Sequence, residues 1–255
     1  MFHVKQLRTR RKIRRKIHVY SEKIKSAFHT MNIHLSDRQA EAFQIYYEML
    51  IQWNENINLT AITEFEQVLM KHFIDSVAVD MVTDMSKIHK IIDVGTGAGF
   101  PGIPLKILYP DMELTLLDSL NKRVKYLQAV TKRLELSKVT LIHGRAEEIG
   151  RMEEYREQYD LCVSRAVANL SVLSEYCVPF IKTGGYFISY KAEEVEEEAE
   201  TAQKAIRCLH CEKPVIEKVR IPGSDIVRSF VIIRKKGRTD MRYPRKPGVP
   251  AKNPL

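Results

Sequence analysis

The sequence predicts an α/β protein built on a mostly parallel, doubly wound, Rossmann-like sheet. Short apolar runs alternate with helical periodicity from about residue 90 to residue 209, which is typical of parallel sheets. A glycine-rich loop at residues 95–99 directly follows the first run, and the second run ends in Asp118. Strand, glycine loop, helix, and a second strand ending in an acid form a nucleoside pocket in such sheets.

The expected elements follow from the spacing of apolar residues and from the residues that interrupt them. Two helices, at 36–53 and 63–82, precede the sheet and should cap it; asparagines after Trp53 break the first. The sheet should contain strands at 90–94, 113–118, 139–143, 159–163 and 185–190, with helices at 101–109, 120–135, 171–181 and 193–209.

The C-terminal part differs from this alternation. Residues 213–220 and 230–235 are β-like with only a Pro-Gly-Ser-Asp turn between them, which predicts an antiparallel hairpin that closes the sheet. Residues 243–250 contain too many prolines for a helix or a central strand.

Composition limits the class of protein. A chain of 255 residues with 44% hydrophobic residues can form one large domain, or one domain with a small accessory one. No apolar run approaches the ~20 residues of a membrane helix. The four cysteines show no disulfide framework, so we expect a reducing, cytoplasmic location and no membrane association.

The positive charge is concentrated at the two ends of the chain. Residues 1–25 carry ten basic side chains against one acid, and residues 234–255 carry eight against one. These ends have net charges of +9 and +7, so the stretch between them has −7, given the total of +9. Two basic ends favour a polyanionic partner such as nucleic acid over tails that only aid solubility. An Arg-rich targeting segment is the other interpretation of residues 8–16, although serine is nearly absent there.

The glycine spacing is compatible with two cofactors. Gly95-x-Gly97-x-Gly99 suits S-adenosylmethionine (SAM), which needs close backbone approach but presents no pyrophosphate. Gly97-x-Gly99-x-x-Gly102 also fits the dinucleotide pattern, and Asp118 lies near the expected offset of about 20 residues. Spacing alone favours SAM only slightly.

Several polar residues lie just past expected strand ends, where ligands bind in such sheets. Arg165 would contact cofactor or substrate there, or form a surface ion pair. Ala146 and Glu147 fall where an adenine would lie, although Glu147 also fits an ordinary acid at a helix N-terminus. Lys191, after the fifth strand, is placed to hold a phosphate or a base.

Other residues have both a functional and a structural interpretation. His72 and Asp75 share one helix face, which either faces a substrate or packs the helix on the sheet. Cys208 and Cys211 lack the further ligands of a structural zinc site, so we expect packing roles and no metal. Cys162 and Cys177 lie inside a strand and a helix, and we expect both in the core.

Six motifs resemble the RsmG (GidB) family, which methylates guanine N7 in bacterial 16S ribosomal RNA. They agree in order and spacing, and the resemblance extends from about residue 33 to the C-terminus. The motifs are DVGTGAGFPGIPL at 93–105, LDSLNKR at 117–123, SRA at 164–166, WNENINLT at 53–60, HFIDS at 72–76 and YPRKPG at 243–248.

The resemblance implies SAM as cofactor and 16S rRNA of the small ribosomal subunit as partner. It implies four segments: a basic arm at 1–20, a helical cap at 21–85, a SAM-binding methyltransferase domain at 86–236 and a basic, proline-rich tail at 237–255. The arm extends beyond the usual family start. The SAM-binding residues expected by position are Gly95, Gly97, Gly99, Phe100, Asp118, Ala146, Glu147 and Arg165.

In this interpretation Arg165 bridges the cofactor and substrate sides, and we expect it to be the residue closest to catalysis. The residues expected on the substrate side are His72, Asp75, Lys122, Arg123, Lys191, Arg245 and Lys246. No cysteine lies at a strand tip and no Asn/Asp-Pro-Pro-aromatic motif occurs, which fits direct attack by guanine N7 without a covalent intermediate. The alternatives are a dinucleotide-dependent oxidoreductase and a non-catalytic RNA-binding protein on the same fold.

Overall fold

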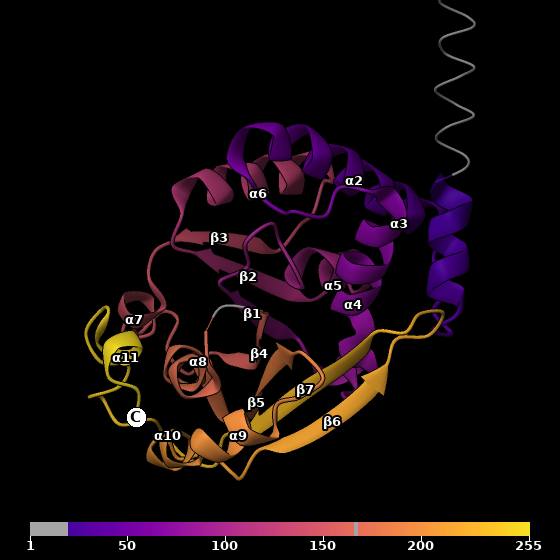
Figure 1. The fold of residues 1–255 in the computed structure, drawn as a ribbon. Helices are drawn as coiled ribbons and strands as arrows, with labels where there is room; N and C mark the ends of the chain where they lie inside the picture. Colours follow the sequence, from indigo (N-terminus) through magenta and orange to yellow (C-terminus); the bar gives the residue numbers. More distant parts are fainter. Residues whose placement is uncertain (1–19, 166–167) are drawn as a thin grey trace, which may run out of the picture.

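A seven-stranded sheet forms the centre of the molecule (Figure 1). The structure is a computed structural model and describes residues 20–165 and 168–255. The predicted N-terminal basic arm therefore lies almost entirely outside the described residues, as does Ala166 of the third motif. The strand order is β3-β2-β1-β4-β5-β7-β6.

The first five strands are parallel and the last two form the antiparallel hairpin that the sequence predicts. The α/β class and the hairpin are thus confirmed. Three strands, β1 to β3, match their expected ranges, whereas β4, β5 and β7 are longer than expected and β6 is shorter. The strands are β1 Lys90–Val94, β2 Glu113–Asp118, β3 Val139–His143, β4 Tyr159–Arg165, β5 Ile181–Lys191, β6 Val215–Arg220 and β7 Val227–Arg234.

Each face of the sheet is covered by its own apolar core. One core joins the N-terminal helices to α5 and α6, with large buried side chains such as Phe43, Tyr46 and Phe73. The other joins the helices that follow β4 to the opposite face, through residues such as Leu173 and Phe187. The helices around the sheet are α5 Gly102–Leu108, α6 Asn121–Arg133, α7 Ala146–Ile149, α8 Leu170–Cys177 and the 3-10 turn η4 Val178–Phe180.

The first N-terminal helix ends later than its asparagines indicate. Ser36 caps α2 (Asp37–Ile57) with a capping box, as the sequence suggests. The helix then passes through Trp53 and Asn54 and ends at Asn58, which adopts the left-handed conformation at φ 49°. Asn54 is helical because its side chain accepts hydrogen bonds from the backbone amides of residues 59 and 60, which follow the helix end.

The second N-terminal helix is interrupted by a π-helical turn. The segment expected at 63–82 consists of α3 Phe65–Val68, the π-turn η1 Leu69–Ile74, α4 Asp75–Val77 and the 3-10 turn η2 Ala78–Met81. A further 3-10 turn, η3 Met85–Lys87, precedes β1. The π-turn changes the direction of the side chains that follow it, and such turns occur frequently at functional sites.

Two predictions for the C-terminal region were wrong in detail. The single helix expected at 193–209 is two short helices, α9 Glu196–Thr201 and α10 Gln203–Cys208. The proline-rich tail contains a short helix, α11 Val249–Lys252. Pro250 is compatible with this helix because it lies in the first turn, where a backbone N–H would have no partner within the helix. The tail lies back against α7 and α8 (Figure 1).

Candidate functional site

The glycine-rich loop follows β1 at the carboxyl edge of the sheet. Gly95, Gly97 and Gly99 all have positive φ angles, at 72°, 62° and 96°. A Cβ on Gly99 would lie 2.7 Å from the Tyr46 hydroxyl, so the loop requires glycine there for space as well as for conformation. The glycines therefore fix a backbone path that a ligand can approach closely.

Two buried carboxylates hold this loop. Asp93, fully buried at the end of β1, accepts hydrogen bonds from the Thr96 hydroxyl at 2.7 Å and the Gly102 amide at 2.9 Å. Asp118, at the tip of β2, accepts from the Gly97 amide at 2.9 Å and is 2% exposed. The predicted ribose acid thus also organises the loop.

A pocket of about 250 Å³ opens beside the loop. It is lined by Gly95 and Asp118 on one side and by Ala146 and Glu147 of α7 on the other, with Tyr176 of α8 beside them. Concave sites of about 300–1,000 Å³ hold drug-sized ligands, so this pocket fits part of a nucleoside cofactor. Four of the eight predicted cofactor residues, from three separate strand ends, meet in this pocket, whereas Gly97, Gly99, Phe100 and Arg165 do not line it.

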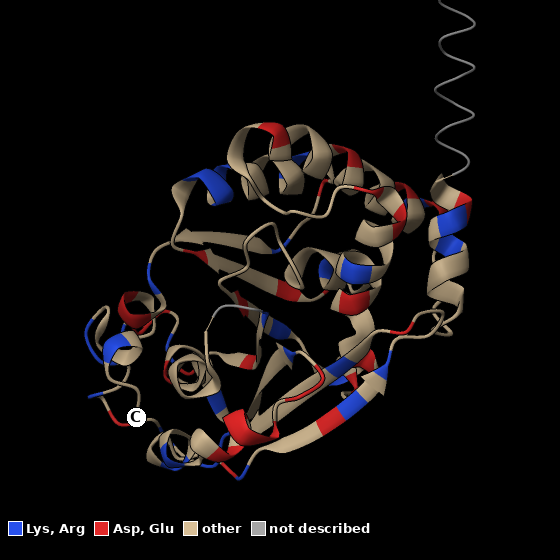
Figure 2. Cartoon of the chain, viewed as in Figure 1, with Lys and Arg blue, Asp and Glu red and all other residues tan. Residues whose placement is uncertain are grey.

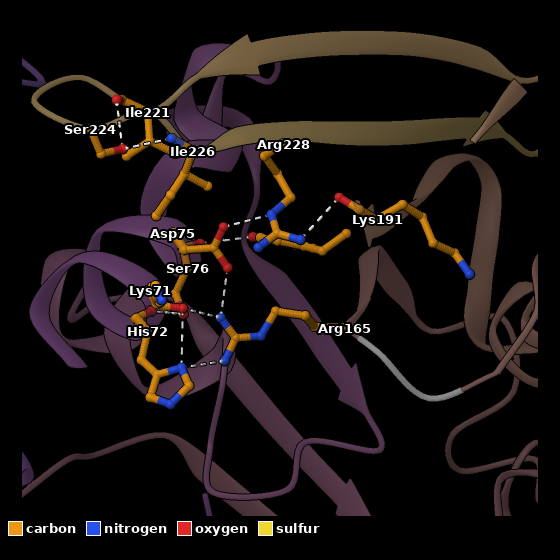
Figure 3. A network of polar contacts seen from close by, with 11 residues as sticks. Lys71, His72, Asp75, Ser76, Arg165, Lys191, Ile221, Ser224, Ile226 and Arg228 are labelled. Atoms are coloured by element: carbon orange, nitrogen blue, oxygen red, sulfur yellow. Dashed lines mark hydrogen bonds and ion pairs between the residues drawn. The ribbon is translucent and has the colours of Figure 1, made fainter. Parts of the chain in front are cut away.

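Figure 3 shows a second polar cluster, in which the side chains of Arg165 and Arg228 both point toward Asp75. Arg165 donates to the Asp75 carboxylate at 2.7 Å, and Arg228 donates to the other oxygen of Asp75 at 2.6 Å. Asp75 is fully buried, while the two arginine side chains are 13% and 20% exposed. One carboxylate therefore orients two arginines at the open edge of the sheet.

An aromatic stack connects this cluster to the glycine loop. The His72 ring stacks on Phe100 with centroids 4.6 Å apart, and the Arg165 guanidinium lies 5.1 Å from the Phe100 centroid. The Thr60 hydroxyl is 2.9 Å from His72 Nε2. The π-turn places His72 and Asp75 so that both reach Arg165. Their shared face is thus polar and directed at Arg165.

Burial and charge determine the protonation of this region. Burial, reinforced by the positive charge of Arg165, lowers the pKa of His72 to about 4. Burial raises the pKa of Asp93 to about 6 despite its hydrogen bonds to Thr96 and Gly102. At pH 7 the imidazole is therefore neutral, and Arg165 is the cationic group of the stack.

Two of the expected phosphate-binding cations are engaged within the protein. Lys191 donates to the Ala168 carbonyl at 2.9 Å and to Glu198 at 2.7 Å. Arg245 forms a forked ion pair with Glu175, which is fully buried. Lys191 therefore ties residue 168 to α9, and Arg245 ties the tail to α8.

Lys122 and Lys246 are exposed, and Arg123 is partly buried with its guanidinium 3.4 Å from Asp118. In Figure 2 basic positions are visible on α6 and along the tail. These exposed cations remain available to a polyanion.

The four cysteines are unpaired, and all but the partly exposed Cys208 are buried. Cys162 and Cys177 are fully buried in one core, and burial raises the pKa of Cys211 to about 12. Among residues 20–165 and 168–255, no cluster of three or more His, Cys, Asp or Glu side chains could hold a metal ion. No helix in the same ranges is long and apolar enough to cross a membrane.

Sequence reasoning missed Asp93, Arg145, Tyr176 and Arg228. Arg145 and Tyr176 line the pocket, and Asp93 lies one residue before the end of β1, close to the ligand edge of the sheet. Arg228 gave no signal because it begins a strand. The antiparallel register places Ser229 opposite Lys191, which brings the start of β7 to the carboxyl ends of the parallel strands.

Fold and pocket together define a Rossmann-like α/β protein with a candidate nucleoside site at the carboxyl edge of its sheet. A solved chain from Klebsiella pneumoniae, provisionally assigned as an O-methyltransferase, superposes with a TM-score of 0.50 at 13% identity. The superposition covers 75% of this chain and 90% of that one, and it shows the shared fold.

The chain belongs to the GidB family, whose model is described as rRNA small subunit methyltransferase G and matches residues 39–227. It is 48% identical to ribosomal RNA small subunit methyltransferase G of Alkaliphilus metalliredigens, over 91% of this chain and 97% of that protein. It is 44% identical to the Bacillus subtilis protein of that name, over 92% and 98%. The resemblance from the motifs is thus confirmed, and SAM replaces the dinucleotide alternative.

Proposed function

We propose that this protein transfers the methyl group of SAM to N7 of a guanine in ribosomal RNA of the small subunit. The observation that carries the proposal is the shared location of two sites in a chain of this family. The nucleoside pocket and the Arg165 cluster flank one glycine loop at the carboxyl edge of the sheet. A cofactor and a substrate base can therefore meet at that loop.

The pocket residues fit a SAM adenosine group by shape and by donor set. Gly95 and Gly97 allow close backbone approach, Asp118 lies at the strand tip that faces a ribose, and Glu147 lies where adenine would bind. When bound, SAM supplies an electrophilic methyl group, and the in-plane lone pair of guanine N7 can accept it without losing a proton. No general base is then needed, and alignment becomes the main task of the protein.

Arg165, Phe100 and His72 would align the substrate base. Arg165 is fixed over Phe100 by Asp75, so one face of its planar guanidinium is held against the ring. Single-stranded RNA bases stack on aromatic rings and on guanidinium planes, which makes the outer face of Arg165 a platform for a splayed guanine. His72 stays neutral at pH 7 and adds no positive charge where a cationic base is formed.

Exposed cations around the loop would hold the RNA backbone. Lys71, Lys122, Arg145 and Lys246 are all exposed, and Arg145 also lines the pocket. Contacts to phosphate position an RNA without reading its sequence, and they weaken with salt. We place the predicted phosphate contacts on these side chains and give Lys191 and Arg245 a structural role instead.

The decisive experiment supplies methyl-labelled SAM and small ribosomal subunits that lack the modification. The RNA is then digested, and labelled 7-methylguanosine is sought by mass spectrometry. We expect label in that nucleoside and its loss with Arg165→Ala, while the variant still binds SAM. Label in another nucleoside would refute guanine as the methylated base. Turnover of Arg165→Ala close to wild type would refute the role of Arg165.

A further inference from the structure

The C-terminal tail is anchored by arginines that bind its backbone. Arg156 donates to the carbonyls of Thr239 at 2.7 Å and Tyr243 at 2.9 Å, and its side chain is buried. Arg151 donates to the carbonyl of Arg242 at 3.0 Å. These bonds hold residues 239–243 in one conformation against the loop that follows α7.

A buried ion pair continues this anchoring toward the cofactor pocket. Glu175 of α8 accepts the Arg245 backbone amide at 2.7 Å and its guanidinium at 2.7–2.9 Å. Paired hydrogen bonds of this kind fix direction as well as distance. The chain after Arg245 is thereby led along α8 toward α7.

The tail then reaches a pocket residue directly. Gly248, at a φ of 81°, donates its backbone amide to Glu147 Oε1 at 3.0 Å. Glu147 is 5% exposed and lines the pocket beside Tyr176. Burial and the neighbouring Glu147 carboxylate raise the pKa of Tyr176. One oxygen of Glu147 is thus occupied by the tail, more than 100 residues away along the chain.

We propose that the C-terminal tail is part of the cofactor site, with the Gly248 amide positioning the Glu147 carboxylate to receive a donor of the SAM adenine. The inference rests on the proposed placement of SAM in this pocket. A glutamate side chain has several rotatable bonds, and fixing it before the cofactor arrives removes an ordering cost from binding. Gly248 is therefore a positioning residue and does not itself contact the cofactor.

Truncation tests this role with a control built into the chain. The variant lacking residues 248–255 loses the donor, whereas the variant lacking 253–255 keeps Gly248 and residues 249–252 of α11 and removes the Asn253 capping hydrogen bond and the apolar contact of Leu255. We expect the longer truncation to raise the Kd for SAM and for S-adenosylhomocysteine about ten-fold in calorimetry, the scale of one charge-assisted hydrogen bond. The shorter truncation should change either Kd less than about two-fold. At saturating SAM the methylation rate of small subunits should be nearly unchanged.

A double-mutant cycle separates positioning from general damage. If the tail acts through Glu147, truncation at 248 should not weaken SAM binding further in a Glu147→Ala background. An additive loss in that background would overturn the inference, and so would unchanged affinity in the truncated wild-type sequence. If Glu147→Ala itself leaves the SAM affinity unchanged, the cofactor placement under the proposed function fails as well. The two failures are therefore distinguishable.

Discussion

Replacing Asp75 with asparagine should impair the substrate side of the site and leave the cofactor pocket intact. Asp75 is fully buried, and each of its oxygens accepts from one arginine, Arg165 at 2.7 Å and Arg228 at 2.6 Å. In the Asp75→Asn variant the new amide would keep the shape and one acceptor oxygen but lose the charge that both guanidinium groups need. Arg165 would then no longer be fixed over the Phe100 ring.

The cost follows from the burial of the three groups. Removing one partner of a buried ion pair costs about 3–5 kcal/mol. The lower end applies because the Arg165 and Arg228 side chains are 13% and 20% exposed and can recruit water. About 3 kcal/mol in a domain of this size lowers Tm by about 6–12 °C. A shift of about 1 Å in a reacting group can reduce the rate about 100-fold.

Turnover and SAM affinity should then respond differently in this one variant. Turnover on small subunits should fall about 100-fold. The Kd for SAM should change less than about three-fold, because Asp75 does not line the nucleoside pocket. Asp80→Asn is the matched control from the same helical segment. Asp80 accepts from the Tyr109 hydroxyl, and burial raises its pKa to about 6, so the folded state disfavours its charge and loss of that charge should not lower the free energy of unfolding.

Three outcomes would contradict the reasoning. Near wild-type turnover of Asp75→Asn would show that Arg165 does not depend on Asp75. A loss of SAM affinity as large as the loss of turnover would show that the two sites are not separate. If Asp80→Asn lowered Tm as much as Asp75→Asn does, the destabilisation would be a general result of changing a carboxylate in this segment.

Three further predictions test the loop, the pH dependence and the RNA surface. Gly99→Ala should destabilise the protein more than Gly184→Ala in thermal melts, because both have positive φ but only Gly99 lacks space for a Cβ; equal shifts would refute this. The pKa of His72 is lowered from 6.5 to about 4, so below pH 6.5 the unfolded chain binds a proton at this residue that the folded protein does not. The free energy of unfolding is therefore unaffected by His72 above pH 6.5 and falls on acidification toward pH 4. In denaturant titrations wild type should therefore lose about 3 kcal/mol relative to His72→Gln between pH 7 and pH 4, and parallel pH profiles would count against the shift. Lys122→Ala should reduce the salt dependence of RNA binding by about one unit of slope, whereas Lys87→Ala, 80% exposed on the side where β1 begins, should not.

Local sequence determined the parallel sheet and the cofactor side of the site. Short apolar runs mark the parallel strands, and a strand end carries its glycine loop or acid with it, so Gly95 and Asp118 were predictable from their neighbours. Parallel strands bring all their carboxyl ends to one edge, which is why residues from three strand ends meet in one pocket.

Only the tertiary structure decided which charged side chains are free. Arg245 has the sequence context of an RNA-binding residue, yet Glu175 engages it, and a pairing partner 70 residues away has no local signature. Lys191 is engaged by Glu198, which is only 7 residues away but lies on the separate helix α9. Arg228 reaches Asp75 only through the antiparallel register of β7. Periodicity reports which face of an element is buried, whereas the partner of a buried charge depends on how distant elements pack.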